Sequence, residues 1–176
     1  MLEIRVDLEE GFDEESSKFV ETSSFTVHLE HSLSSLSKWE SVWEEPFLGK
    51  KDKTEKQTIS YIEMMIIDDD LPPGVFQKLI NDHLQDIMNY VSADMTATKF
   101  HLDPNSPQSR ETITSELIYY WMISMNIPVE FERWHLNRLI TLIRVINLKN
   151  TPKKKMSATD RRNLNRQRLK QRNTRG

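Results

Sequence analysis

Residues 113–148 read ITSELIYYWMISMNIPVEFERWHLNRLITLIRVINL, the stretch with the strongest helical periodicity in this chain of 176 residues. Apolar side chains recur there every three or four positions, a spacing that places them on one face of a helix. Pro128 interrupts the run, because proline lacks the amide hydrogen that a helix interior needs. We therefore predict one helix before Pro128 and a second from Val129 to about Leu148.

The same spacing assigns a buried face to each of these two helices. The face of the first is expected to hold Ile113, Leu117, Tyr120, Trp121 and Met125. The face of the second is expected to hold Phe131, Trp134, Leu136, Leu139, Ile140, Leu142, Ile143 and Ile146. Together these side chains predict a helical core.

Three shorter helical patterns precede this stretch. Ser32 or Ser34 is expected to cap the first and Thr54 the second, because a hydroxyl oxygen accepts a hydrogen bond from the first turn of a helix. Pro72 and Pro73 are expected to lie in the first turn of the third, where a missing amide hydrogen breaks no helical bond. These helices are expected to join the same core.

The N-terminal residues follow a different period. Alternation with polar residues, the pattern of a half-buried strand, runs through Leu2, Ile4, Val6 and Leu8. A second strand is expected over residues 19–30, with residues 9–18 as the connection. A two-stranded hairpin is marginal alone, so we expect it to rest on the helices.

These patterns predict a mainly α protein with three parts. Residues 1–31 are expected to form a small N-terminal β-hairpin and residues 32–150 a helical core domain. Residues 151–176 are expected to form a basic C-terminal tail.

Charge is unevenly distributed along the chain. Residues 149–176 carry eleven lysines and arginines against one aspartate, a net charge of +10, whereas residues 1–148 carry −13. Leu164 and Leu169 are the only apolar residues between Arg161 and Arg172, so a helix there cannot bury itself and needs a partner to become ordered. The tail is suited to binding an acidic protein surface or a polyanion.

The composition excludes several classes of protein. The chain has no cysteine and no signal-peptide pattern, so we expect no disulfide framework and a reducing cytoplasm as its compartment. The longest apolar run, Leu117–Ile127, has 11 residues, well short of the ~20 of a membrane-spanning helix, so no membrane contact is expected. Only 4 glycines are present, none in a phosphate-binding motif, and no cofactor is expected.

Residues of types that bind metals or act in catalysis have structural explanations. The run Asp68–Asp70 lacks the spacing of a calcium loop and is expected to form a solvated turn or to dock a basic segment. His28 and His31 form a His-x-x-His pair without a third ligand. His135 has no nucleophile or paired acid beside it. We therefore predict a protein with neither enzymatic activity nor a metal site.

The residues expected to contact a partner fall into an aromatic group and a basic group. Trp39, Trp43 and Phe47 flank the acidic pair Glu44–Glu45, and aromatic residues of this kind are typical of surfaces that anchor another protein. Tryptophans at helical spacing also suit a core, so both placements stay open. The basic group comprises Lys153, Lys154, Lys155, Arg161, Arg162, Arg166 and Arg168.

Several short motifs together resemble a known family. They are Ser37–Glu40, Trp43–Leu48, Met95–Thr98, Glu116–Met122, Asn126–Pro128, Trp134–Leu139, Leu142–Arg144, Lys149–Asn150, Pro152–Met156 and Thr174–Gly176. In these motifs the chain resembles a family of small tailed-bacteriophage proteins associated with tail assembly, the tail assembly chaperones that act around the tape-measure protein. The resemblance extends from about Val27 to Gly176.

The resemblance implies a non-catalytic protein of the infected bacterium's cytoplasm that coats the tape-measure protein until tail-tube subunits displace it. An aromatic and methionine-lined groove would shield an amphipathic helix of that partner, or of another phage tail protein. The basic tail would contact acidic stretches of the partner or of a neighbouring copy, so self-association is also expected.

Two other functions remain open. One is a minor structural protein of the virion, at the connector, tube or baseplate, whose basic tail lies between neighbouring subunits. The other is a small nucleic-acid-binding regulator, which we rank last. The acidic body repels nucleic acid, and the tail has no aromatic residue for stacking on bases.

Overall fold

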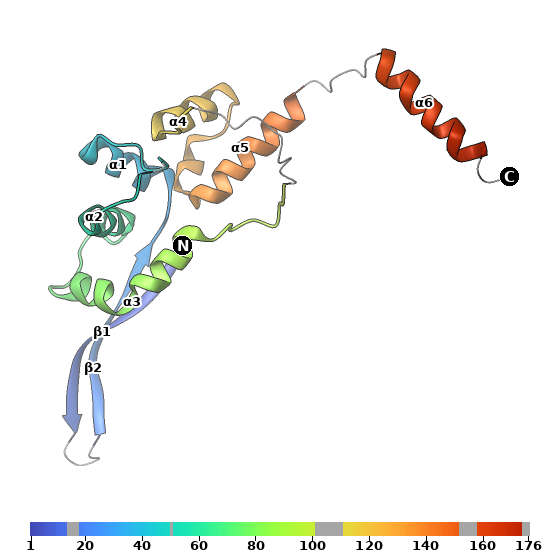
Figure 1. Ribbon diagram of the computed structural model, residues 1–176. Coiled ribbons are helices and arrows are strands. Elements are labelled where there is room, and N and C mark those ends of the chain that lie inside the picture. The colour runs from blue at the N-terminus through green and yellow to red at the C-terminus, as the bar shows by residue number, and fades with distance from the viewer. Residues whose placement is uncertain (14–17, 50, 101–110, 152–157, 174–176) are drawn as a thin grey trace. The chain divides into compact units, whose positions relative to one another are not determined.

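The computed structural model describes residues 1–13, 18–49, 51–100, 111–151 and 158–173. The fold is mainly α with one N-terminal β-hairpin, as predicted (Figure 1). The chain forms two compact units, Met1–Val145 and Ile146–Gly176.

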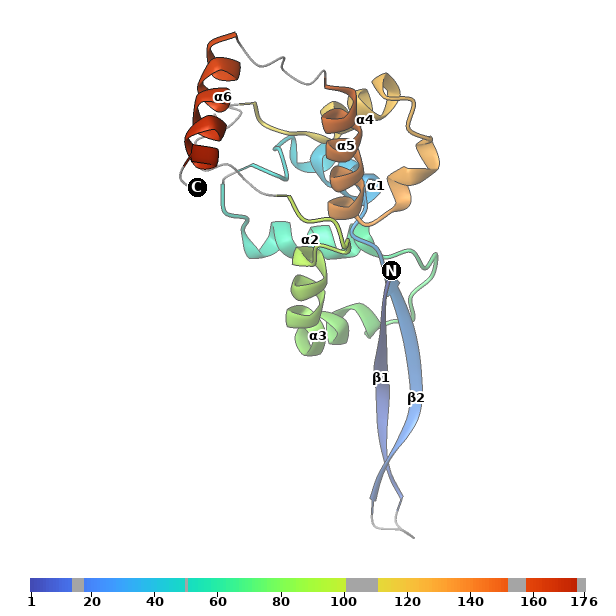
Figure 2. The same cartoon turned by 90° about the vertical axis from the view of Figure 1, so that its right-hand side faces the viewer.

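Strand β1 (Leu2–Asp13) pairs antiparallel with β2 (Lys18–Leu29), and the two strands lie side by side (Figure 2). The two expected strands are confirmed, but the prediction that residues 9–18 connect them is wrong. Residues 9–13 continue β1, and Gly11 pairs with Val20. Backbone pairing with β2 outweighs the low strand propensity of the acidic residues in this segment. The register of the pairing shifts on either side of Glu9.

Packing against helices stabilises the base of the hairpin. Ile4, Val6, Val27 and Leu29 are buried, and helix α3 (Val75–Ser92) packs against β1. A hairpin of two strands needs such support, because it buries too little apolar surface alone. The sequence prediction that the hairpin rests on helices is confirmed.

Helices α1 (Leu33–Trp43) and α2 (Glu55–Met65) begin at the predicted caps. The Ser32 side chain accepts a hydrogen bond from the Ser35 N–H. Thr54 and Gln57 form a reciprocal capping box, in which each side chain bonds the other residue's backbone N–H. These bonds satisfy amide groups that a helix start otherwise leaves without partners.

Helix α3 begins later than predicted. Pro72 and Pro73 precede it instead of forming its first turn, and Gly74 is the residue before the helix, with φ +86°. This left-handed conformation is strained for residues with a side chain but open to glycine. The turn is closed by the Val75 N–H, which donates to the Pro72 carbonyl at 3.2 Å.

Helix α4 (Ser115–Ser124) follows the Thr114 cap, but the face it buries is not the predicted one. Ser115, Ile118 and Met122 are buried, whereas Tyr120 is 64% exposed. Because α4 is apolar on nearly every side, spacing alone did not determine which face would turn inward.

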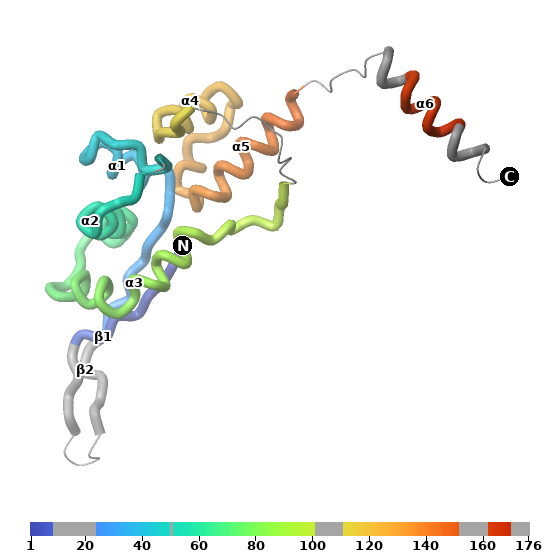
Figure 3. Tube along the Cα trace, in the orientation of Figure 1, coloured from blue at the N-terminus to red at the C-terminus, as the bar shows by residue number. Residues whose placement is uncertain are grey.

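The single helix predicted from Val129 onward is two elements, the 3-10 helix η1 (Val129–Arg133) and α5 (Leu136–Asn150) (Figure 3). Backbone pairing with the segment before α1 causes the break. His135 forms an isolated β-bridge with Ser32, and the Leu136 N–H donates to the His31 carbonyl at 2.7 Å. Of the predicted buried face, Leu136, Leu139 and Ile143 are buried.

The second unit contains the basic helix α6 (Ala158–Asn173). The sequence allowed a helix here but no core for it. Among the side chains described between residues 162 and 169, none is buried, and Leu169 is 59% exposed.

Candidate functional site

The aromatic residues predicted to bind a partner belong to a ring cluster between α1 and α2. Trp39 stacks on Trp43 at 6.0 Å between ring centroids and meets the edge of Phe47 at 5.1 Å. Phe47 lies 4.0 Å from Tyr61, whose ring in turn meets that of His31 at 5.7 Å. The fold thus brings the three predicted residues together.

Most of this cluster is core. Trp39 is 1% and Phe47 is 9% exposed, so neither ring presents an open surface to a partner. The Trp39 indole N–H donates to the Gln57 carbonyl at 2.9 Å, as a buried indole requires. Trp43 is half-buried, and its indole N–H donates to the Ser60 hydroxyl at 3.2 Å. Of the two placements left open for the tryptophans, Trp39 takes the core, and Phe47, which was predicted to contact a partner, is buried beside it.

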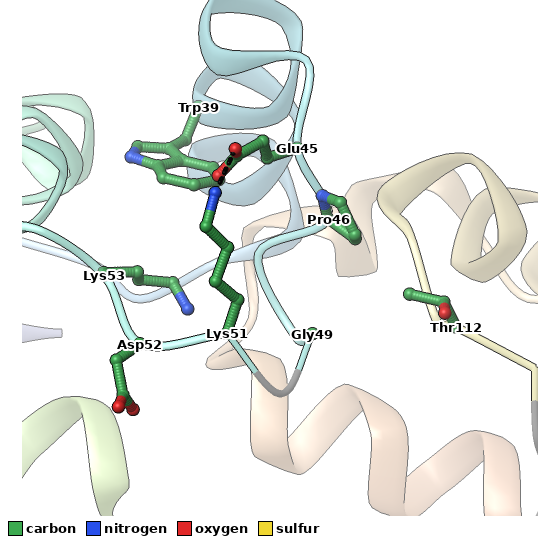
Figure 4. A pocket seen from close by; sticks show the side chains of 8 residues that line it. All are labelled: Trp39, Glu45, Pro46, Gly49, Lys51, Asp52, Lys53 and Thr112. Atoms are coloured by element: carbon green, nitrogen blue, oxygen red, sulfur yellow. Dashed lines mark hydrogen bonds and ion pairs between the residues drawn. The ribbon is translucent and has the colours of Figure 1, made fainter.

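A hollow of about 280 Å³ lies beside Trp39 (Figure 4). Its acidic residues are Glu45 and Asp52, and Glu45 accepts hydrogen bonds from Lys51 at 2.5 Å and Gln57 at 3.1 Å. The Lys51 hydrogen bond, followed by that from Gln57, lowers the pKa of Glu45. Lys53 lies 4.4 Å above the Phe47 ring. The acidic character predicted here is therefore partly compensated by lysines.

A buried carboxylate holds the cluster in place. Glu40, on α1, accepts a hydrogen bond from the Phe47 N–H at 2.8 Å and another from the Ser115 N–H at 2.6 Å. It thereby ties the α1–α2 connection and the start of α4 to one side chain. No sequence motif marks this role.

Two buried histidines lie next to the cluster. The rings of His31 and His135 are 5.0 Å apart, and His31 Nδ1 lies 2.5 Å from the Tyr61 hydroxyl. His135 Nε2 lies 3.0 Å from the Tyr90 carbonyl, which only accepts, so Nε2 carries the proton. His135 Nδ1 is then a buried acceptor without a hydrogen-bond partner.

Burial keeps both histidines neutral. It lowers the pKa of His31 to about 3, with a smaller contribution from His135. Burial also lowers the pKa of His135, and it raises the pKa of the Tyr61 hydroxyl. The sequence predicted structural histidines, and both rings pack in the core, where the hydrogen-bond partner of His31 is the buried Tyr61 hydroxyl.

The acidic run after α2 contributes a structural contact. Asp68 accepts hydrogen bonds from the His28 N–H at 2.7 Å and from His28 Nδ1 at 2.9 Å. Partial burial raises the pKa of Asp68, but these two hydrogen bonds outweigh it, and the net pKa is lowered. Within the described ranges, no group of three or more His, Asp or Glu side chains is arranged to hold a metal ion.

A methionine-lined groove of about 430 Å³ lies between the start of α1 and the end of α2. Its apolar lining is contributed by Met1, Met64, Met65, Ile66 and Ile67. Lys38 and Arg133, both exposed, are its basic members. We call this surface the methionine groove. The run Met64–Ile67 was a signal for it in the sequence.

The backbone of the groove is firmly held. The segment after α2 pairs with the end of β2, where the Glu30 N–H donates to the Met65 carbonyl at 2.9 Å and the Ile67 N–H to the His28 carbonyl at 3.0 Å. The Ile67 side chain nevertheless remains 53% exposed. A backbone held by these hydrogen bonds, with Met1 and Ile67 exposed and Met64 and Ile66 half-buried, can bind a ligand without rearrangement.

A second uncovered apolar surface lies on α4. Tyr120 and Ile123, one helical turn apart, are 64% and 72% exposed. Glu116 lies one turn before Tyr120, and hydrogen bonds from its own backbone N–H and from Thr114 lower its pKa. We call Glu116, Tyr120 and Ile123 the α4 face. Sequence reasoning missed it by assigning Tyr120 to the core.

The predicted basic residues are only partly described. Lys153, Lys154 and Lys155 lie outside the described residues, as does the side chain of Arg161. Arg162, Arg166 and Arg168 are exposed on α6. They belong to the second unit, whereas the aromatic cluster belongs to the first.

Within the part of the chain that the structure describes, no helix is both long enough and apolar enough to cross a membrane. Comparisons with protein-family models, curated proteins and solved structures give no match for this chain.

Proposed function

We propose that this protein is a non-catalytic tail assembly chaperone of a tailed bacteriophage. In this proposal it binds the tape-measure protein in the cytoplasm of the infected bacterium, before the tail tube forms. The methionine groove is the observation that carries the proposal, together with the resemblance to phage tail assembly chaperones. No cofactor or metal is part of this activity.

The groove suits an apolar helix as its ligand. A tape-measure protein presents long amphipathic helices, whose apolar faces aggregate when nothing covers them. Methionine side chains are unbranched and polarisable, so Met1, which is 58% exposed, and Met64, which is half-buried, can adapt to successive turns of such a helix that differ in shape, whereas Met65 is buried. A chaperone that covers a long partner needs this tolerance.

The exposed charges of the groove favour an acidic ligand. Lys38 and Arg133 are both exposed there, whereas its acidic residue, Glu30, is buried and pairs with the Met1 amine. Acidic side chains beside the apolar face of the bound helix would approach these cations. We therefore propose an amphipathic helix with acidic flanks as the ligand.

Co-expression with a candidate tape-measure protein tests the proposal. The tagged full-length protein should retain the partner in the soluble fraction and elute with it in size-exclusion chromatography. Replacing Met64 and Ile67 by serine should reduce the retained partner about tenfold or more, because the anchoring apolar area is lost.

Val42→Ser is the matched control for the groove variant. Val42 is an apolar residue of α1, 64% exposed, and it does not line the methionine groove. This substitution should leave retention unchanged. If both variants, or neither, lower the retention, the groove is not the binding surface.

A minor structural protein of the virion is the second candidate. The observation that favours it is α6, where Arg162, Arg166, Arg168 and Leu169 are exposed and would suit contacts between neighbouring subunits. Purified virions distinguish the two functions. A chaperone should be absent from them, whereas a fixed copy number per particle would overturn the chaperone proposal and support the structural one.

A further inference from the structure

The α4 face is an exposed helix surface with one charged end. Glu116, Tyr120 and Ile123 occupy positions i, i+4 and i+7, which share one side of a helix. The opposite side of α4 buries Ile118 and Met122 in the core. The exposed side therefore presents a carboxylate, an aromatic ring and an aliphatic side chain in a row.

Helix α6 carries a complementary row at the same spacing. Arg162, Arg166 and Leu169 also occupy positions i, i+4 and i+7, and all three are exposed. A helix with so few apolar residues gains little stability by itself, so contact with another surface would stabilise it. We call these three residues the α6 face.

We propose that the α6 face of one copy of the chain docks on the α4 face of a second copy. The equal spacing permits a parallel register in which three pairs meet. The pairs are Arg162 with Glu116, Arg166 with Tyr120, and Leu169 with Ile123. They combine an ion pair, a cation–π contact and an apolar contact, each of a kind known to stabilise helix surfaces.

Charge complementarity identifies a second copy as the occupant. Residues 149–176 carry +10 and residues 1–148 carry −13, so the tail of one copy is attracted to the body of another. Each copy offers one face of each kind, and such a head-to-tail contact extends into rows or rings. A nucleic acid would satisfy the arginines but would leave Leu169 and the α4 face uncovered.

This contact goes beyond the proposed function and is independent of it. Neither Tyr120 nor Ile123 lines the methionine groove. A failure of self-association would therefore leave binding of the tape-measure protein untouched, and the reverse also holds.

Sedimentation velocity of the full-length chain over a wide concentration range tests the proposal. The wild-type mass should rise with concentration, and the rise should diminish when salt is raised from about 0.05 M to about 0.5 M, because screening weakens the ion pairs. Ile123→Asp removes the α4 face, and Arg162→Glu with Arg166→Glu removes the α6 face. Each should weaken self-association about tenfold or more.

Mixing these two variants separates contact between copies from contact within one copy. The Ile123→Asp chain retains an α6 face, and the doubly charge-reversed chain retains an α4 face. An equimolar mixture should form one-to-one pairs that do not grow further. A wild-type chain that stays monomeric, or a mixture that forms no pairs, would overturn the proposal.

A charge exchange tests the register. Glu116→Arg should abolish association, and adding Arg162→Glu in the same chain should restore it. Glu116 also lies in the first turn of α4, where its charge stabilises the helix, so circular dichroism should verify that both variants are folded. Val42→Asp, on α1, is the matched control and should associate like wild type. Failure of the exchange to restore association would contradict the pairing of Arg162 with Glu116.

Discussion

The Oε2 atom of Glu40 accepts a 2.6 Å hydrogen bond from the backbone N–H of Ser115, 75 residues later in the chain. Its other oxygen accepts from the Phe47 N–H, so one buried carboxylate connects α1, the α1–α2 connection and the start of α4. Hydrogen bonds to a charged acceptor are stronger than those between neutral groups. We infer that Glu40 fixes both the aromatic cluster and the orientation of α4.

Glu40→Gln should destabilise the fold by about 2–4 kcal/mol. The amide offers only one oxygen, and its NH₂ group would face a backbone N–H that also donates. Urea denaturation measures the change. Glu44→Gln, at the exposed end of α1, is the control and should stay within about 0.5 kcal/mol of wild type. Equal effects of the two substitutions would contradict the role of Glu40.

Stability should fall as the pH drops below about 6.5, the pKa of an unperturbed histidine. Burial lowers the pKa of His31 to about 3 in the folded protein, so between these values the unfolded chain binds more protons. The contribution of His31 to the free energy of unfolding is therefore complete above pH 6.5 and is lost progressively as the pH falls towards 3. Between pH 7 and 5.5 we expect a loss of about 1 kcal/mol from His31, and His135 acts in the same direction.

His31→Asn isolates this contribution. The variant should be less stable than wild type at pH 7, because contacts with Tyr61 and His135 are lost. Its stability should nevertheless vary less between pH 7 and 5.5. Urea midpoints at both pH values measure how steeply stability changes with pH. If the variant changes as steeply as wild type, the assignment to His31 is contradicted.

Trp39→Phe should destabilise the protein more than Trp43→Phe. Trp39 is buried and its indole N–H donates to the Gln57 carbonyl, so the substitution leaves a cavity and removes this hydrogen bond, at about 2–3 kcal/mol. Trp43 is only half-buried, and its substitution should cost about 1 kcal/mol or less. Thermal unfolding of both variants tests this ranking. If Trp39 were a surface residue, Trp39→Phe would destabilise the protein no more than Trp43→Phe does.

Thr54→Ala should cost about 1 kcal/mol through loss of the capping box at the start of α2. Thr58→Ala, on the same helix, is the control. The Thr58 hydroxyl donates to the backbone carbonyl of Thr54, one turn earlier, and is expected to contribute little. Equal destabilisation by both substitutions would mean that the cap is unimportant.

Local signals predicted much of the fold. The hydroxyls of Ser32 and Thr54 marked helix starts correctly, and alternation in residues 2–8 marked the first strand. These features depend on neighbouring residues, which a sequence displays directly. The division between η1 and α5 could not be predicted, because it depends on pairing of His135 with Ser32, about a hundred residues away.

The candidate surfaces were less predictable than the fold. Trp39 and Phe47 were correctly grouped but lie in the core, because the placement of a ring depends on what packs over it. Tyr120 was predicted to be buried because α4 is apolar on nearly every side. Only the tertiary fold selects which face of α4 is buried. The pairing of Glu40 with Ser115 also joins distant segments and has no local signature.

Hydrogen exchange of the full-length protein, alone and in complex with a tape-measure protein, tests whether the methionine groove receives the partner. We predict slower exchange on binding at residues 64–67 and at the start of α1, which line this groove. The hollow beside Trp39 should show no comparable change. Unchanged exchange at residues 64–67 in a complex that has formed would contradict the proposal that this groove receives the partner.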